Sequence, residues 1–193
     1  MVRNQLKPEI GSTTMTGVLE PGCTIWITGL SGAGKTTTAL ALRDELAQQS
    51  RNAIVLDGDE LRKGLSSDLG FSAENRDEQV RRVGEIARLL CRQGFIVIVS
   101  LISPRASARR TVRGQHASES LKFIEVYMST PLEICEGRDP KSLYARARAG
   151  HELHLTGMGD PYEAPEHPDI SVSTETLLPD EIARQILSTW LNS

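Results

Sequence analysis

Three glycines fall within six positions, directly after a run of apolar and β-branched residues, in the stretch TIWITGLSGAGKTT that spans residues 24–37. Glycine loses more conformational freedom on folding than any other residue, so such a cluster indicates a place where the backbone must be bare. From Gly29 to Thr36 the stretch matches G-x-x-x-x-G-K-[ST], and it lies between a predicted strand at 23–28 and a predicted helix at 35–49. The sequence therefore predicts a phosphate-binding loop.

The chemistry of such a loop follows from its backbone. Its N–H groups form a nest for phosphate oxygens, and the next helix adds the positive end of its dipole. We expect Lys35 to contact the β- and γ-phosphates of ATP and the Thr36 hydroxyl to ligate Mg²⁺, the expected cofactor. A glycine-rich turn without a ligand is the alternative, which the complete motif disfavours. The expected ATP-binding residues of the loop are Gly29, Leu30, Ser31, Gly32, Ala33, Gly34, Lys35 and Thr36.

Apolar runs and helical patterns alternate along the rest of the chain. Further strands are predicted at 52–57, 95–103, 122–129 and 170–174, and further helices at 78–94 and 179–191. Alternating elements with strands buried on both faces are typical of a parallel sheet covered by helices. The predicted fold class is therefore α/β: a P-loop kinase fold with about five parallel strands sandwiched between helices.

Domain organisation follows from length and composition. At 193 residues the chain predicts one domain over 21–193, preceded by a loosely ordered lead-in at 1–20. The segment 136–168 is irregular, charged and rich in Gly, Pro and Arg, which favours a mobile loop region over a second domain. We expect a lid at about 136–160 within it.

Charge and hydropathy limit the partners. The net charge of −3 gives no basic surplus for nucleic acid. No apolar run approaches the ~18 residues of a membrane span, and the first residues lack the apolar centre of a signal peptide. We therefore expect no nucleic acid, no membrane and a cytoplasmic location. Cys23, Cys91 and Cys135 have neither metal-ligand nor C-x-x-C spacing, so we expect reduced, structural thiols.

The phosphate loop alone does not name a reaction. The N-K-x-D segment by which GTPases read their base is absent, and no apolar strand obviously ends in an Asp or Asp-Glu pair of the motor type. Chain size and the charged late segment favour a small-molecule kinase, so the acceptor decides the function.

Acidic and basic residues after the second strand indicate an anionic acceptor. In the stretch LDGDELR, Asp59 could orient an acceptor hydroxyl, take its proton or hold Mg²⁺ through water; a solvated turn is the alternative. Two like charges ~4 Å apart cost about 4 kcal/mol at an effective dielectric of 20, so an anionic acceptor beside ATP needs cations. Four arginines follow around Phe71, and each could equally form a surface salt bridge. They are Arg62, Arg76, Arg81 and Arg82, and at most one of the last two faces the site.

Other polar residues have plainer interpretations. Ser103 and Pro104 end the third strand, where Ser103 could face the cleft, cap the next helix, or do both. Arg105, Arg109 and Arg113, at four-residue spacing, predict an exposed helix face, although Arg109 could reach a phosphate. His151 and His154 favour a solvated or lid pair over a metal site, and Trp26 favours the core.

Taken together, these stretches resemble the adenylylsulfate (APS) kinase family. The matching segments cover about residues 23 to 170 in order: WITGLSGAGKTT, LDGDELRKGLSSDLGFSAENRDE, RRVGEIARL, SLISP, CEGRDPKSLYARARAG and TGMGDPYEAP. The resemblance implies transfer of the ATP γ-phosphoryl group to the 3′-hydroxyl of adenosine 5′-phosphosulfate (APS), giving PAPS and ADP, the second step of sulfate activation. It also implies a homodimer and functional coupling to ATP sulfurylase.

The resemblance further implies roles for single residues. Lys35, Asp59 and Ser103 are the implied catalytic residues; the family describes the serine as a phosphoserine intermediate, whereas we favour a positioning role because phosphoryl transfer is mainly positioning and charge neutralisation. Arg138 joins the ATP-binding residues. Lid residues are Arg138, Asp139, Lys141, Arg146 and Arg148. The implied APS-binding residues are Asp59, Arg62, Phe71, Arg76, Gln79, Ile102, Ser103, Lys141 and Leu155.

Several positions depart from the family pattern. Gln79 and Ser66 stand where the family has Asn, Ser142 where it has Gly, and Leu155 where it has Phe; Met158, Gly159 and Asp160 replace I-D-S. Base–aromatic stacking contributes roughly 1–3 kcal/mol, so Leu155 should weaken APS binding unless Phe71 carries more of the contact. Two rivals remain: a gluconate- or shikimate-type kinase, and a nucleotide-binding regulatory domain without turnover.

Overall fold

The computed structural model describes residues 22–150 and 155–192. The predicted lead-in at 1–20 and the histidine pair His151 and His154 lie outside the described residues. Five strands form one parallel sheet in the order β2-β3-β1-β4-β5, which confirms the predicted α/β class. They are β1 (Cys23–Gly29), β2 (Ala53–Asp57), β3 (Ile96–Ser100), β4 (Lys122–Met128) and β5 (Ile170–Val172).

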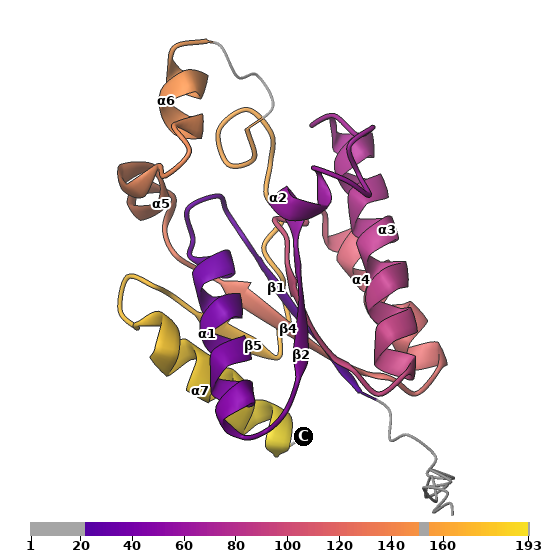
Figure 1. Ribbon diagram of the computed structural model, residues 1–193. Helices are drawn as coiled ribbons and strands as arrows, with labels where there is room; N and C mark the ends of the chain where they lie inside the picture. Colours follow the sequence, from indigo (N-terminus) through magenta and orange to yellow (C-terminus); the bar gives the residue numbers. More distant parts are fainter. Residues whose placement is uncertain (1–21, 151–154, 193) are drawn as a thin grey trace, which may run out of the picture.

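Helices cover both faces of this sheet (Figure 1). On one face lie α1 (Lys35–Gln48) and α7 (Pro179–Leu191), and on the other lie α3 (Ala73–Arg92) and α4 (Ala106–Ser118). Three short helices stand beyond the carboxyl ends of the strands: α2 (Gly58–Leu61), α5 (Leu132–Arg138) and α6 (Leu143–Arg148). Helix α6 and the end of α5 lie in the segment 136–168 expected to be irregular, so that prediction was wrong in part.

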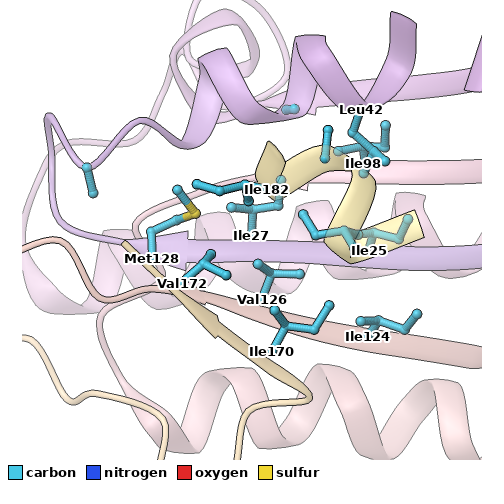
Figure 2. Close-up of a cluster of buried hydrophobic side chains, with 14 of the residues drawn as sticks. Ile25, Ile27, Leu42, Ile98, Ile124, Val126, Met128, Ile170, Val172 and Ile182 are labelled. Atoms are coloured by element: carbon cyan, nitrogen blue, oxygen red, sulfur yellow. The ribbon is translucent and has the colours of Figure 1, made fainter. Parts of the chain in front are cut away.

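The core lies on both sides of the central strand β1, whose seven residues are all buried. Side chains of a strand alternate between its faces. Ile25 and Ile27 point to the α1 and α7 side (Figure 2), while Trp26 packs with the α3 and α4 side, as expected for a core residue. Ile98 and Val99 divide in the same way on β3. This two-sided burial explains the continuous apolar runs in the sequence.

Element boundaries differ from the predictions for local reasons. Helix α3 begins five residues before the predicted start at 78, because the Ser72 hydroxyl accepts a hydrogen bond from the Asn75 N–H and caps the first turn. Strand β3 ends at Ser100, since Ser103 has a left-handed φ of 41° ahead of Pro104. Strand β5 has three residues in place of the predicted five.

The topology creates a crevice at the carboxyl edge of the sheet. The chain leaves β1 for the face that carries α1 and leaves the neighbouring β3 for the face that carries α4. In open parallel sheets, ligands bind where two such connections diverge. The loop after β1 is the predicted phosphate loop, so the fold places it at this crevice.

Candidate active site

A cleft of about 900 Å³ opens at this crevice. The phosphate loop forms its floor, and the segments after β2 and β3 form one wall. The connections around α5 and α6 and between β5 and α7 supply the rest. Most of the residues predicted for ATP and for the acceptor therefore line a single cavity.

The phosphate loop is held by close contacts with the protein itself. Gly32 (φ 76°) and Gly34 (φ 90°) adopt conformations that side chains rarely reach. A Cβ at Gly32 would lie 2.7 Å from the Cys135 carbonyl oxygen, and one at Gly34 would lie 2.8 Å from the Thr174 methyl group. The glycines thus allow the loop to pack against α5 and the β5–α7 connection, a role that the motif alone does not reveal.

Lys35 lies at the start of α1 inside the cleft, where its Nζ donates to the Leu30 carbonyl of the same loop at 2.7 Å. Burial, with the charge of Lys141 adding to it, lowers the pKa of Lys35 to about 8. A loss of solvation disfavours the ammonium form, and a bound phosphate would favour it. The side chain is placed to neutralise a phosphate at the loop.

Thr36 and two strand ends form an oxygen-rich corner. The Thr36 hydroxyl donates to Asp57 Oδ2 at 2.7 Å and lies 3.4 Å from the Ser100 hydroxyl. Hydroxyl and carboxylate oxygens suit Mg²⁺, which keeps several waters and is bound through one or two protein groups plus phosphates. The oxygen donors of this corner therefore fit the ion. In the described ranges 22–150 and 155–192, no group of three or more His, Cys, Asp or Glu side chains could hold a metal.

Asp57 was missed by the sequence analysis, which found no clear acidic strand end. The signal was present, because the apolar strand AIVLD ends in this residue. Its other oxygen accepts the Asp59 N–H at 3.0 Å and caps the short helix α2. Asp57 therefore links the metal corner to the acceptor wall.

Not every residue of the motif faces the cleft. Ser31, Gly32, Gly34, Lys35 and Thr36 line it, whereas Gly29, Leu30 and Ala33 do not. Ala33 is fully buried, and Leu30 lies on the far side of the loop near Leu132 and Gly157.

The acceptor wall carries an aromatic ring with two guanidinium groups close to it. Arg62 lies 4.5 Å and Arg76 5.5 Å from the ring centroid of Phe71, which is half-exposed. Arg62 donates to the carbonyl groups of Leu69 and Gly70, and Arg76 donates to that of Phe71. All three side chains line the cleft, so two cations are oriented before any ligand arrives.

Asp59, Lys141 and Gln79 complete this side. Asp59 forms an ion pair with Lys141, which comes from the connection between α5 and α6. Both side chains are half-exposed, so the pair contributes little to stability. Gln79 is buried and donates to the Gly58 carbonyl at 3.0 Å. Asp59, Lys141 and Gln79 all line the acceptor side of the cleft.

Ile102 and Ser103 line the cleft after β3, but the Ser103 hydroxyl is already engaged. It accepts from the Trp26 indole N–H at 3.1 Å and donates to the Thr28 hydroxyl at 2.9 Å, and the residue is 2% exposed. The alternative that Ser103 caps the next helix is wrong, because α4 begins at Ala106 and its N-cap residue is Arg105.

Leu155 lies within the range expected for the lid, lines the cleft and is buried at 3% exposure. It belongs to the core cluster on the α1 side of the sheet. Leucine at this position can make an apolar contact with a ligand, but it has no aromatic ring on which a base could stack.

Besides Arg138, which the resemblance implied, the donor side includes residues that the sequence analysis did not name, beginning with Thr174. Arg138 donates to the Thr174 hydroxyl at 2.6 Å and to its carbonyl at 2.9 Å, and the Thr174 hydroxyl donates to Ala33 in the phosphate loop. The cleft continues along Leu177, Leu178 and Pro179. No sequence motif marks this apolar stretch. It lies at the site because the preceding strand β5 pairs with β4.

The segment expected to form a lid is bonded to the phosphate loop. Tyr144 of α6 is buried and its hydroxyl donates to the Ser31 carbonyl at 2.9 Å. Asp139 caps the start of α6 by accepting the N–H groups of Tyr144 and Ala145. Ser142, which the resemblance aligns with a family Gly, adopts a left-handed φ of 53°. Arg146 lines the cleft, and Arg148 instead pairs with Glu136.

Two arginine predictions need correction or refinement. Arg81 and Arg82 both pair with Glu78, and neither lines the cleft. Arg109 was expected on an exposed helix face, which is wrong: its side chain is 3% exposed and pairs with Glu125 at 2.8 Å. Helical spacing alone did not show that β4 supplies a buried carboxylate opposite this position.

The three cysteines are free and buried. Burial raises the pKa of Cys23 to about 12 and also raises the pKa values of Cys91 and Cys135. The thiolate is the reactive form, so all three are held in the inert thiol form, as expected of structural cysteines. Within the described part of the chain, no helix is long and apolar enough to cross a membrane.

A phosphate loop on a parallel sheet, facing a wall of oriented cations across one cleft, defines a small-molecule kinase of the P-loop class. The family model for adenylylsulphate kinase matches residues 21–173. The chain belongs to the adenylylsulphate kinase family.

Individual relatives agree with this assignment. The adenylyl-sulfate kinase of Paraburkholderia xenovorans is 48% identical over 86% of this chain and 92% of its own length. A solved structure of the Mycobacterium tuberculosis APS kinase CysC, in complex with AMPPNP and APS, superposes with a TM-score of 0.86 at 44% identity, covering 90% of this chain and 99% of that one. A hexameric APS kinase from Thiobacillus denitrificans has a TM-score of 0.65 at 34% identity, over 90% of this chain and 29% of that one.

Proposed function

We propose that the chain transfers the γ-phosphoryl group of ATP to the 3′-hydroxyl of adenosine 5′-phosphosulfate, giving PAPS and ADP. The observation that carries the proposal is the cleft itself, in which the phosphate loop and the Arg62–Phe71–Arg76 arrangement share one cavity. One nucleotide fits the loop and a second anionic nucleotide fits the arginines. The family assignment supports this substrate pair.

On the donor side, we assign phosphate binding to the loop N–H groups, the start of α1 and Lys35. Lys35 would exchange its bond with the Leu30 carbonyl for one with a phosphate oxygen. The Thr36 hydroxyl and Asp57, directly or through water, would hold Mg²⁺, which supplies charge neutralisation for the migrating phosphoryl group. Arg138 and the apolar segment Leu177–Pro179 would flank the adenine of ATP.

On the acceptor side, Arg62 and Arg76 would bind the phosphosulfate with paired donors, and Phe71 would contact the adenine. Leu155 would add an apolar contact, and Ile102 and Gln79 would limit the shape of the pocket. Asp59 would leave Lys141 and accept a hydrogen bond from the 3′-hydroxyl, so that this oxygen attacks the γ-phosphorus as its proton is taken up. Lys141 would then face the transferring charge.

Ser103 has a positioning role in this proposal. Its hydroxyl is enclosed by Trp26 and Thr28, so it would have to leave both partners before it could attack a phosphate. Direct attack by the acceptor hydroxyl needs no such step. Ser103 would therefore hold the shape of the turn beside the acceptor.

Organisation and location remain predictions for this chain. We propose a single domain over 21–193 with a lid at about 136–160, a homodimer, a cytoplasmic location and functional coupling to ATP sulfurylase. Light scattering of the purified chain tests the oligomeric state: a dimer mass supports the proposal, and a monomer or hexamer mass contradicts it.

The deciding experiment is an acceptor screen with the purified chain, ATP and Mg²⁺. APS, gluconate and shikimate are offered separately, ADP release is followed, and the product formed from APS is identified by mass and by nuclear magnetic resonance. We expect ADP release only with APS and a phosphate on the 3′ position. Turnover of gluconate or shikimate would indicate another small-molecule kinase, and ATP binding without turnover would indicate a regulatory domain.

A further inference from the structure

The Arg109 side chain joins three separate segments behind the acceptor wall. It comes from α4 and is 3% exposed. Its Nε donates to Glu125 Oε1 at 2.8 Å, its Nη1 to the Ser103 carbonyl at 2.7 Å and its Nη2 to the Glu163 carbonyl at 2.7 Å. A guanidinium group has donors in a fixed plane, so these three acceptors are held in a fixed arrangement.

The first of these segments is strained. Ser103 has a φ of 41°, in a region that is unfavourable for a non-glycine residue and persists only where the surroundings hold it. Trp26 and Thr28 hold its hydroxyl, and Arg109 holds its carbonyl. Loss of the guanidinium would leave that carbonyl without its charged donor and would let the turn relax away from the cleft.

The second segment runs from Leu155 to Glu163. Glu163 donates its N–H to the Pro104 carbonyl at 2.9 Å, and its carboxylate accepts the Ala106 N–H at 2.7 Å, which caps α4. The neighbouring Tyr162 reaches the Thr28 hydroxyl at 2.9 Å and lies 5.7 Å from the Arg109 guanidinium. Arg109 therefore fixes the end of the segment that begins at Leu155 on the cleft.

Both segments continue directly into the acceptor pocket. Ile102 and Ser103 line it from one side and Leu155 from another, whereas Arg109 does not reach it. From this geometry we propose that Arg109 is a positioning residue for the acceptor nucleotide, a role that rests on the proposed APS kinase function. It sets the distance between two parts of the wall without touching the substrate.

The charges around Arg109 provide matched variants. Glu125 also faces Arg113, at 3.5 Å, and Arg113 pairs with Asp169 at 2.5 Å. Removing one partner of a buried ion pair leaves an uncompensated charge, so the double variant Arg109→Met with Glu125→Gln is preferable to a single one. Arg113→Met is the control, since Arg113 lies on the same helix and meets the same carboxylate but donates to Glu125 and Asp169 rather than to Ser103 or Glu163.

The test compares steady-state constants for the two substrates in the wild type, the double variant, Arg109→Lys and Arg113→Met. Thermal unfolding and the Kd for ATP establish that each variant is folded. We expect the double variant to raise the KM for APS about tenfold or more, because misplaced contacts are costly in a preorganised site, while the KM for ATP stays unchanged. Lysine should not rescue it, as one ammonium group cannot reach three acceptors in a plane.

Three results would overturn the proposal: an unchanged KM for APS in the double variant and in Arg109→Lys, equal changes in both KM values, or the same selective rise in Arg113→Met. If the double variant fails to fold, Arg109→Lys, which keeps the charge, decides the question: a raised KM for APS with an unchanged KM for ATP supports the proposal. Failure of the proposed function is a separate result, because the wild type itself would then show no turnover of APS.

Discussion

The two halves of the cleft are built from different material. The part of the donor half predicted to bind phosphate comes from one contiguous motif, Gly29–Thr36, of which Ser31, Gly32, Gly34, Lys35 and Thr36 line the cleft. The acceptor half is made of side chains from distant segments, from Asp59 to Leu155, each held by its own partners. Phosphate is common to many substrates and needs only N–H groups, whereas a particular acceptor needs shape.

This contrast has a consequence for sensitivity to mutation. A change in the donor half should damage turnover as a whole, because the transferring phosphate is bound there. A change in the acceptor half should raise the KM for APS and leave ATP binding intact. The predictions below test that division, beginning with the largest expected effect.

Lys35→Ala should lower kcat by roughly 10³-fold, because the γ-phosphate loses the charge that stabilises it during transfer. Steady-state assays at saturating ATP and APS measure the effect. Arg43→Ala on the same helix, where Arg43 pairs only locally with Asp44, is the control and should behave as the wild type. An unaltered kcat in Lys35→Ala would remove this residue from the mechanism.

Arg76→Ala should raise the KM for APS by roughly 10- to 100-fold, since a hydrogen bond to a charged group contributes about 1.5–3 kcal/mol. The KM for ATP should stay the same. Arg81→Ala is the matched control, because Arg81 lies on the same helix and pairs with Glu78 outside the cleft. A change in the KM for ATP alone would show that Arg76 belongs to the donor half of the cleft and not to the acceptor half.

Leu155→Phe should lower the KM for APS several-fold if a ring at this position stacks on the acceptor base, because stacking contributes roughly 1–3 kcal/mol. The site is buried, so the larger side chain should also lower the unfolding temperature. Leu177→Phe, on the donor half, is the control and should leave the KM for APS unchanged. A weaker affinity for APS in Leu155→Phe would show that strain outweighs stacking.

ATP binding should take up part of one proton near the lowered pKa of Lys35, about 8. The free cleft favours the neutral amine and a bound phosphate favours the ammonium form, so uptake should appear from about pH 8 upward and fade below it. Titration calorimetry in buffers of different ionisation enthalpy measures the proton. The same linkage predicts that this group's unfavourable effect on folding is relieved as pH rises from 8 towards 10.5. Lys35→Met should abolish the uptake.

The sequence predicted the fold and the donor half well, because both depend on local patterns. Apolar runs gave the five strands, and one contiguous motif located the phosphate loop. Boundaries were less accurate where a single cap or strained residue decides them, as Ser72 does for α3 and Ser103 does for the end of β3.

The acceptor half was predictable only in its residue types. Family resemblance named Arg62, Phe71 and Arg76, but nothing in their spacing showed that both guanidinium groups contact the ring. Arg109 was misread because its partners lie 6, 16 and 54 residues away in the chain. Such contacts depend on tertiary packing, which periodicity within one helix does not encode.

The tyrosine at the base of α6 bears on how ligands reach the cleft. The Tyr144 hydroxyl bonds to the phosphate loop at Ser31, whereas Lys141, just before the same helix, pairs with Asp59 on the acceptor side. If this segment is the proposed lid, the buried Tyr144 bond would serve as its hinge beside the phosphate loop, and the half-exposed Lys141–Asp59 pair would be the contact that breaks when the cleft opens.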